Sequence, residues 1–573
     1  MPCSKPALAS QSDLWYICAL TDGHKRAVII PDCLHRMLLQ ATIFITGAAI
    51  LALELLASRI MTPYFGVSLY IWSGILSITL VSLALGYWAG GRLASGRNGR
   101  APPPEKLAFL FTLMPALAAL AIVAACLAYP YLFYRLARLD LVLGAFGACL
   151  ILLGVPLLAT SAMNPLLVAI RLRQSARGEL ADAGAGRVFF VSTIGSVAGV
   201  LVTAFGLIPY VSNFSSALLV ATSLAVLPLI LLFGTAVKVA GRKPLATTAA
   251  VALAASLGLL AGADAYTGRM WPASYSGVNW QREASYRSLF GTVKVLKSEP
   301  LENGQFLRIY FQDGLIQNMV DGDNQSMSLY TYALEALSFA YRPALRSALV
   351  LGLGAGMVPM RLAGRGLEVT AVDIDPASLT AATEVFGFDR GRIRTHQTDA
   401  RTFLRSCDAG YPVVIVDLFH GDGIPEYLVT RDFFHDLKRC LGPDGIAVFN
   451  TFADLDSPRV YAHFLTTLRA EFPFIVLYRP DYGPAARHLN SFVVASAKPL
   501  PTPAGAEMQH VPSRHSDTLQ AMLRAPRPLD QQLLESGRVI TDSRNTVTDD
   551  LAESQLIHRR SVLQALPAAF LLN

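Results

Sequence analysis

The chain has 573 residues, of which 53% are hydrophobic, and its formal net charge is +7. A mean hydropathy of +0.43 excludes a simple soluble enzyme as a description of the whole chain. Only nine of the 41 acidic residues precede residue 265, so we predict a membrane domain followed by a soluble domain. The basic excess fits membrane loops that are biased toward Lys and Arg, so no nucleic-acid partner is needed to explain it.

Residues 1–36 are polar and irregular and lack the continuous apolar core of a signal peptide. We expect them to form an N-terminal segment without fixed structure, and Met37 could equally be the start of the protein. The seven cysteines form no C-x-x-C pair and show no metal-ligand spacing. We therefore expect reduced thiols that serve in packing, and no metal.

The segment 37–264 contains about seven apolar stretches that are long enough to cross a bilayer. Glu54 lies inside the first stretch, where a buried acid is costly and indicates either a function or a pairing with Arg59 at the helix end. Small residues from Thr193 to Gly199 in the fifth stretch predict close helix packing. The seven stretches lie near 38–58, 69–91, 107–129, 141–163, 188–210, 214–234 and 245–263.

Basic residues gather in the loops that follow the second, fourth and sixth stretches. The positive-inside rule places all three loops in the cytoplasm, so seven crossings would leave the soluble half outside. Either the count is wrong by one, or the last stretch does not span, or the soluble half is not an ordinary cofactor enzyme. A miscount is the simplest solution, and we expect the soluble domain to be cytoplasmic. The basic residues are Arg92, Arg97, Arg100, Lys106, Arg171, Arg173, Arg177, Lys238, Arg242 and Lys243.

The segment 265–345 reads as a small β-hairpin region followed by a connecting helix. Apolar runs at 289–296 and 306–311 predict antiparallel strands around a turn at Asn303-Gly304. The run 312–317 is expected to continue the sheet, and 330–340 is expected to be the helix.

A glycine motif opens the next domain, which we place at 346–498. The apolar run 348–351 predicts a buried strand, and Gly352, Gly354 and Gly356 follow it on alternate positions. A second predicted strand ends at Asp373, 21 residues after the first glycine, close to the ~20 expected of a nucleoside-binding unit. The spacing G-x-G-x-G, with Met357 where a third dinucleotide glycine would fall, favours a cofactor of the S-adenosylmethionine type over NAD.

Strands and helices alternate through the rest of this domain, which predicts a Rossmann-like doubly wound α/β sheet. Asp373, Asp399 and Asp417 follow three successive strands and should lie at one edge of the sheet, where ligands bind. For each acid alone, a role as a helix cap or loop residue is an equal alternative. The segment 499–573 is expected to be a linker and a C-terminal tail: residues 499–530 are rich in Pro and polar residues, and the tail ends in a helix-like stretch.

The soluble half resembles the spermidine synthase (polyamine aminopropyltransferase) family, and in particular the branch in which that domain follows a multi-pass membrane region. The resemblance implies that the three glycines line the sulfur end of the cofactor, that Asp373 binds its ribose, that Asp399-Ala400 contacts its adenine and that Asp417 is catalytic. The matching motifs are FQDGLIQ (311–317), LVLGLGAG (349–356), AVDID (371–375), TDARTFL (398–404) and VVIVDLF (413–419).

This chain departs from the family where the family binds the charged ends of its substrates. Ala355 stands where the soluble enzymes carry an acid inside the glycine loop, and Tyr332 stands where they carry a glutamate. The catalytic strand is followed by Asp422 in a different spacing from the family's D-x-x-D-P. Asp422, Tyr330 and Gln317 are the candidates for contacts to the acceptor amine.

Three hypotheses follow from the sequence. The first is a membrane-anchored aminopropyltransferase of spermidine biosynthesis, which uses decarboxylated S-adenosylmethionine and an amine such as putrescine. The second is a methyltransferase that uses S-adenosylmethionine on the same fold, since the loss of the acid at Ala355 removes repulsion against the carboxylate of that cofactor. The third is a non-catalytic membrane transport or sensor protein. A small-molecule amine, a lipid bilayer and a homo-oligomer are the partners to consider.

Overall fold

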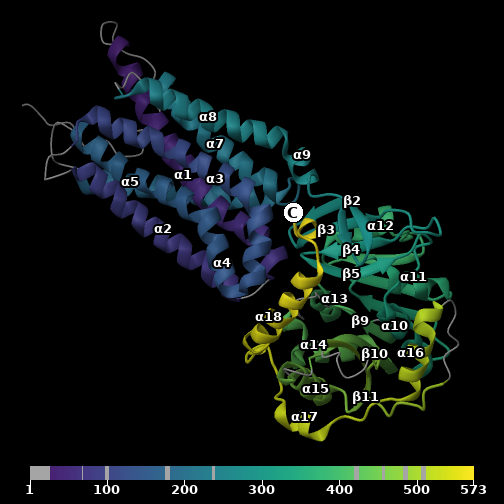
Figure 1. The fold of residues 1–573 in the computed structure, drawn as a ribbon. Helices are drawn as coiled ribbons and strands as arrows, with labels where there is room; N and C mark the ends of the chain where they lie inside the picture. The colour runs from purple at the N-terminus through teal and green to yellow at the C-terminus, as the bar shows by residue number, and fades with distance from the viewer. Residues whose placement is uncertain are drawn as a thin grey trace, which may run out of the picture.

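A computed structural model of the chain describes residues 26–66, 69–96, 102–174, 181–234, 239–408, 410–418, 425–454, 458–481, 488–504 and 511–572. Figure 1 shows two parts: a bundle of long helices, and an α/β part that lies against one end of the bundle. The C-terminus returns to the junction between the two parts.

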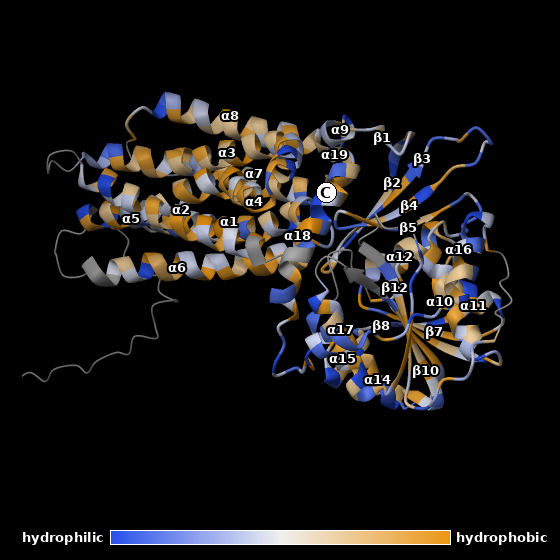
Figure 2. Ribbon diagram, turned by 60° about the horizontal axis from the view of Figure 1, so that its bottom comes forward, coloured by the Kyte–Doolittle hydropathy of each residue, from blue (hydrophilic) through white to orange (hydrophobic). Residues whose placement is uncertain are grey.

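Seven helices of the bundle are long and apolar enough to cross a membrane, as judged by length and composition alone. Hydrophobic residues predominate along these helices (Figure 2). The number of such helices among the described residues is the seven first counted in the sequence, which gives no support to the miscount expected there. Helix α1 begins at Arg26 although residues 1–36 were expected to lack structure. The helices are α1 (Arg26–Phe65), α2 (Leu69–Ser95), α3 (Pro104–Leu139), α4 (Leu141–Cys149) continued through a π-helical turn by α5 (Val155–Gln174), α6 (Ala181–Val202) extended by a second π-helical turn (Thr203–Leu207), α7 (Asn213–Gly234) and α8 (Arg242–Ala261), with the short α9 (Ala263–Gly268) after them.

The fifth span packs closely on the first, as the small residues predict. A Cβ on Gly195 would lie 2.1 Å from the carbonyl oxygen of Phe44, and Ser196 donates a hydrogen bond of 2.9 Å to the carbonyl of Gly47. Arg59 donates to the backbone carbonyl of Leu289 in the α/β part. Among the described residues no ion pair joins Arg59 to Glu54, so the predicted pairing is wrong.

The α/β part begins with an antiparallel sheet of five strands in the order β1-β2-β3-β4-β5. The run 312–317 contains a tight hairpin turn, because Asp313 and Gly314 both have positive φ angles (47° and 92°), the geometry of a two-residue type I′ turn. The strands are β1 (Ala273–Tyr275), β2 (Val278–Ser288), β3 (Gly291–Ser298), β4 (Arg308–Gln312) and β5 (Leu315–Val320), and α10 (Leu329–Tyr341) follows them.

The second sheet has seven strands in the order β11-β12-β10-β9-β6-β7-β8. The five strands from β10 to β8 are parallel, and β12 runs antiparallel to both of its neighbours. One core lies between the sheet and α10, α11, α12 and α16, and another between the sheet and α13, α14, α15 and α17. This is the doubly wound sheet that the sequence predicts.

The elements of this domain alternate along the chain as expected. They are β6 (Ser347–Leu351), α11 (Met357–Gly364), β7 (Glu368–Asp373), α12 (Pro376–Val385), β8 (Ile393–Gln397), α13 (Ala400–Arg405), β9 (Tyr411–Val416), a 3₁₀ turn (Glu426–Leu428), α14 (Arg431–Cys440), β10 (Leu441–Asp454), α15 (Arg459–Glu471), β11 (Phe474–Tyr478) and β12 (His488–Ser496).

The segment expected to be a linker and tail contains four helices: α16 (Ser513–Arg524), α17 (Gln531–Ser536), α18 (Val547–Ala565) and α19 (Ala568–Leu571). Phe570 is fully buried and stacks on Trp271 with ring centroids 5.7 Å apart. The buried Lys294 on β3 donates to the carbonyls of Phe570 and Leu572, the latter at 2.8 Å. This end of the chain therefore belongs to the core at the junction of the two parts.

The expectation of reduced cysteines is wrong for one pair. Cys407, just after α13, forms a disulfide with Cys440 at the end of α14. Helices α13 and α14 pack against each other, which brings the two residues together although 33 positions separate them. Cys126 and Cys149 are free and buried, as expected.

Candidate active site

A cavity of about 710 Å³ lies at the carboxyl ends of β6, β7 and β9. This is the edge at which ligands bind in open α/β sheets. The β4–β5 hairpin, the start of α10 and the end of α18 complete its walls. Eight of the ten residues predicted for the site line this cavity: Gly352, Gly354, Asp373, Asp399, Ala400, Asp417, Tyr330 and Gln317.

The glycine loop forms one wall of the cavity. A Cβ on Gly352, whose φ is +95°, would lie 2.0 Å from the carbonyl oxygen of Asp417, so only glycine lets the loop cross this strand end. A Cβ on Gly354 would meet no atom within 4 Å, which leaves space for a ligand against the backbone. Gly356 does not line the cavity; it caps α11 and packs against Phe388.

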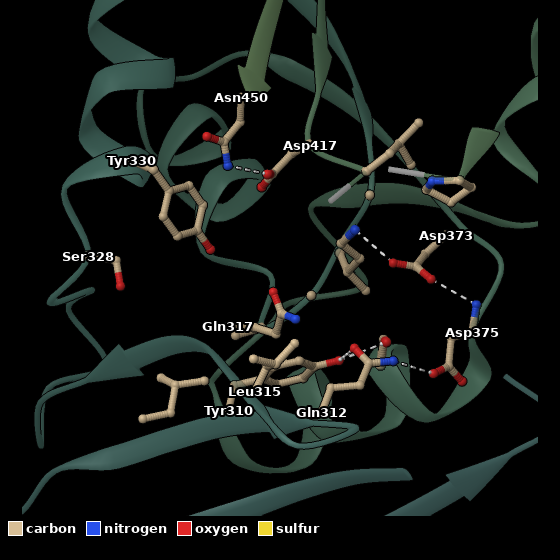
Figure 3. A pocket seen from close by; sticks show the side chains of 18 of the residues that line it. Tyr310, Gln312, Leu315, Gln317, Ser328, Tyr330, Asp373, Asp375, Asp417 and Asn450 are labelled. Atoms are coloured by element: carbon tan, nitrogen blue, oxygen red, sulfur yellow. Dashed lines mark hydrogen bonds between the residues drawn. The ribbon is translucent and has the colours of Figure 1, made fainter. Parts of the chain in front are cut away.

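Asp373 closes β7 and faces the glycine loop (Figure 3). Its carboxylate accepts hydrogen bonds of 2.8 Å from the backbone N–H groups of Leu353 and Asp375. A carboxylate at the end of this strand is the type of group that accepts hydrogen bonds from ribose hydroxyls. Asp375 caps α12 by accepting a hydrogen bond from the N–H of Ala377. It also accepts a hydrogen bond of 3.2 Å from the side-chain amide of Gln312 on the hairpin.

Asp399 serves as the cap of α13, which was the alternative role considered for it. One oxygen accepts from the N–H of Thr402 at 2.9 Å, and the other accepts from the hydroxyl of Tyr427 at 3.0 Å. Asp399 and Ala400 nevertheless both line the cavity, so capping and ligand contact are compatible at this position.

Asp417 follows β9 directly and lines the cavity beside the glycine loop. Burial raises the pKa of its carboxyl to about 6, and the negative charge of Asp373 also raises it, while the hydrogen bond from Asn450 opposes the rise. That bond runs from the Asn450 amide at 2.8 Å, and the Asn490 amide donates to Asn450 in turn at 3.1 Å. A carboxylate with this pKa can both hold a cation and exchange a proton near neutral pH.

Tyr330 stands next to Asp417 and Asn450, with Gln317 below it in the cavity (Figure 3). The Tyr330 hydroxyl accepts from Asn318 at 2.9 Å, and its pKa is raised by burial and by the charge of Asp417. The third candidate for the acceptor amine, Asp422, lies outside the described residues.

Several lining residues were not predicted as parts of the site. Phe290, His558, Val562 and Leu566 border the cavity because the first sheet and α18 fold over the strand ends. A local sequence pattern cannot show this, since these residues lie far along the chain from the glycine motif. Among the residues that the structure describes, no group of His, Cys, Asp or Glu could hold a metal ion.

The family model for the spermine/spermidine synthase domain matches residues 327–480, which carry this site. A polyamine aminopropyltransferase from Vibrio vulnificus is 33% identical over 138 residues, 23% of this chain and 45% of that protein. An N-terminal histidine N-methyltransferase from Emericella nidulans is 31% identical over 161 residues, 26% of this chain and 28% of that protein. Both matches cover less than half of the relative.

Among solved structures, a probable spermidine synthase from Corynebacterium glutamicum superimposes with a TM-score of 0.35 and 17% identity, over 45% of this chain and 95% of that chain. The match to the family model covers the glycine loop, the three strand-end acids and the asparagine beside Asp417. Residues 327–480 are thus similar to the spermine/spermidine synthase domain.

Proposed function

We propose that the chain is an aminopropyltransferase that moves an aminopropyl group from decarboxylated S-adenosylmethionine to an amine. The observation that supports this most is the position of Asp417, a carboxylate of raised pKa beside a nucleoside-sized space. Polyamine aminopropyltransferases among the relatives agree with it.

In this proposal the nucleoside lies along the glycine loop. Asp373 accepts hydrogen bonds from the ribose, and Asp399 and Ala400 lie at the adenine. The backbone at Gly352 and Gly354 lets the sulfonium approach the end of β9, where the loop meets Asp417. The space above Gly354 fits this ligand, and a carboxylate at the position of Asp373 is the type of group that accepts hydrogen bonds from ribose hydroxyls.

Asp417 is proposed to hold the amine and to accept its proton. A free amine is protonated below its pKa of ~10, so a carboxylate that binds the ammonium and takes one proton supplies the nucleophile. The nitrogen then forms a bond to the methylene next to sulfur, and the carbon–sulfur bond breaks with its electron pair going to sulfur. The products are the extended amine and methylthioadenosine. Because a sulfonium is already a good leaving group, most of the catalysis is positioning.

The seven apolar helices are proposed to anchor this domain in a membrane. Hydrogen bonds from α1 and α3 to the α/β part place it at the end of the bundle where these two helices end. The basic residues Arg92, Arg173 and Arg242 lie toward the opposite end. The positive-inside rule favours a cytoplasmic location for that basic end. A cofactor enzyme is expected on the cytoplasmic side, and we predict that location for the α/β part. The distribution of basic residues argues for the opposite side.

A methyltransferase is the second candidate, because methyltransferases occur among the relatives and Ala355 leaves room beside the sulfonium for a carboxylate. The purified full chain in nanodiscs, given either donor and a set of amines, separates the two. Methylthioadenosine from decarboxylated S-adenosylmethionine supports aminopropyl transfer, whereas S-adenosylhomocysteine from S-adenosylmethionine supports methyl transfer. The variant Asp417→Asn should abolish the first product, and Asp444→Asn, which removes an exposed carboxylate of the same domain, should not.

A further inference from the structure

One part of the cavity lining is apolar. It consists of Leu315 and Ile316 on the hairpin, Phe290 in the β2–β3 turn, Val562 on α18 and Leu566 directly after that helix. Phe290 is 45% exposed, a high fraction for an aromatic side chain that borders a cavity. We call these five residues the apolar wall.

The apolar wall lies at the junction with the helical bundle. Arg559 on α18 is buried and donates a hydrogen bond of 3.3 Å to the carbonyl of Pro63 near the end of α1. The hydroxyl of Tyr134 on α3 donates a hydrogen bond of 3.1 Å to the carbonyl of Leu566. Figure 1 shows α18 between the bundle and the α/β part. If the bundle spans a membrane, the apolar wall therefore lies near the membrane surface.

The carboxylates of the cavity's described lining all come from the strand ends: Asp373, Asp375, Asp399 and Asp417. The described lining of the hairpin, α10, α18 and the β2–β3 turn contains no carboxylate, and its titratable groups are tyrosines and His558. The hairpin's own carboxylate, Asp313, accepts from the N–H of Thr292 and lies outside the cavity lining. An ammonium placed against this wall would therefore lose water without gaining a counter-charge from the described lining, which is strongly unfavourable.

We propose that the acceptor is an amphipathic monoamine: one ammonium at Asp417 and an apolar chain along the apolar wall, taken from the membrane surface. This rests on the proposed aminopropyl transfer and narrows its acceptor class. A diamine such as putrescine would place its second ammonium against apolar side chains, whereas an alkyl chain gains by leaving water there.

The test compares linear alkylamines of increasing length with α,ω-diamines of the same length, using the full chain in nanodiscs and release of methylthioadenosine as the readout. The value of kcat/KM should rise about fourfold per added methylene until the wall is covered, as expected from burial of each CH₂. Each monoamine should exceed its matched diamine by at least tenfold. Diamines that equal or exceed the monoamines would overturn the proposal.

Ile316→Glu places a carboxylate in the apolar wall. It should lower kcat/KM for long alkylamines by tenfold or more and raise the relative rate of diamines, while the Kd for methylthioadenosine stays unchanged. The control Ile557→Glu makes the same change on the exposed side of α18, outside the cavity lining, and should leave all three values unchanged. An unchanged preference in Ile316→Glu would contradict the assignment of the wall.

Failure to release methylthioadenosine with any amine would refute aminopropyl transfer itself. The acceptor class can still be decided in that case, by calorimetric binding of decylamine and 1,10-diaminodecane to the protein saturated with methylthioadenosine. Tighter binding of the monoamine, lost in Ile316→Glu, supports the proposal, and tighter binding of the diamine overturns it.

Discussion

Replacing Asp417 with Asn should make the protein more stable at neutral pH and inactive. The pKa of this carboxyl rises from 3.8 to about 6 on folding. The charged form is therefore penalised in the folded state: the penalty is absent below pH 3.8 and complete above pH 6. At ~1.4 kcal/mol per pH unit, its size is at most about 3 kcal/mol. Asparagine carries no charge and can keep an oxygen toward the Asn450 amide.

The assay is scanning calorimetry of the full chain in detergent, for the parent and for Asp417→Asn, at pH 4 and pH 8. For a domain of this size we expect the variant to unfold about 5 °C higher at pH 8 and at nearly the parent temperature at pH 4. Its turnover should fall ~100-fold or more, the scale for loss of a general base. In the parent, kcat/KM should rise as pH passes 6. A variant that is less stable than the parent at pH 8 would refute the reasoning.

Three further predictions test other parts of the structure. Asp373→Ala should weaken methylthioadenosine binding by about 5- to 100-fold in calorimetry, because a hydrogen-bonded ribose loses its acceptor at ~1–3 kcal/mol; unchanged affinity would remove Asp373 from the site. Reduction of the Cys407–Cys440 disulfide, which closes a separation of 33 residues, should lower the free energy of unfolding by ~3–4 kcal/mol, and Cys407→Ser should make the protein insensitive to reductant. Lys498→Cys, on the exposed surface of the α/β part, should react with a membrane-impermeant maleimide in intact cells if the basic end of the bundle is cytoplasmic; reaction only after lysis would support the expected cytoplasmic domain.

The glycine loop and the strand-end acids could be predicted from sequence because they depend on local order. A short apolar strand followed by Gly352 and a second strand ending at Asp373 leaves few alternatives for how the chain folds. The same holds for the seven long apolar helices of the bundle, since each is a continuous apolar run.

The rest of the site depends on contacts between distant segments. Asn490 reaches Asn450 only because β12 inserts antiparallel beside β10. Residues 499–573 looked like a tail because their apolar positions are sparse, yet Phe570 fills a core made by the bundle and the first sheet. The Cys407–Cys440 pair likewise requires the packing of two helices, which cysteine spacing does not show.

The most direct test of the proposed function follows the transferred group itself. Decarboxylated S-adenosylmethionine labelled with ¹³C in the aminopropyl chain is incubated with the full chain in nanodiscs and a mixture of amines, and the products are identified by mass spectrometry. The proposal predicts that the label appears on an amine together with one methylthioadenosine per transfer, and that Asp417→Asn yields neither product. Label that remains on the donor with every amine, while S-adenosylmethionine methylates a component of the mixture, would contradict it.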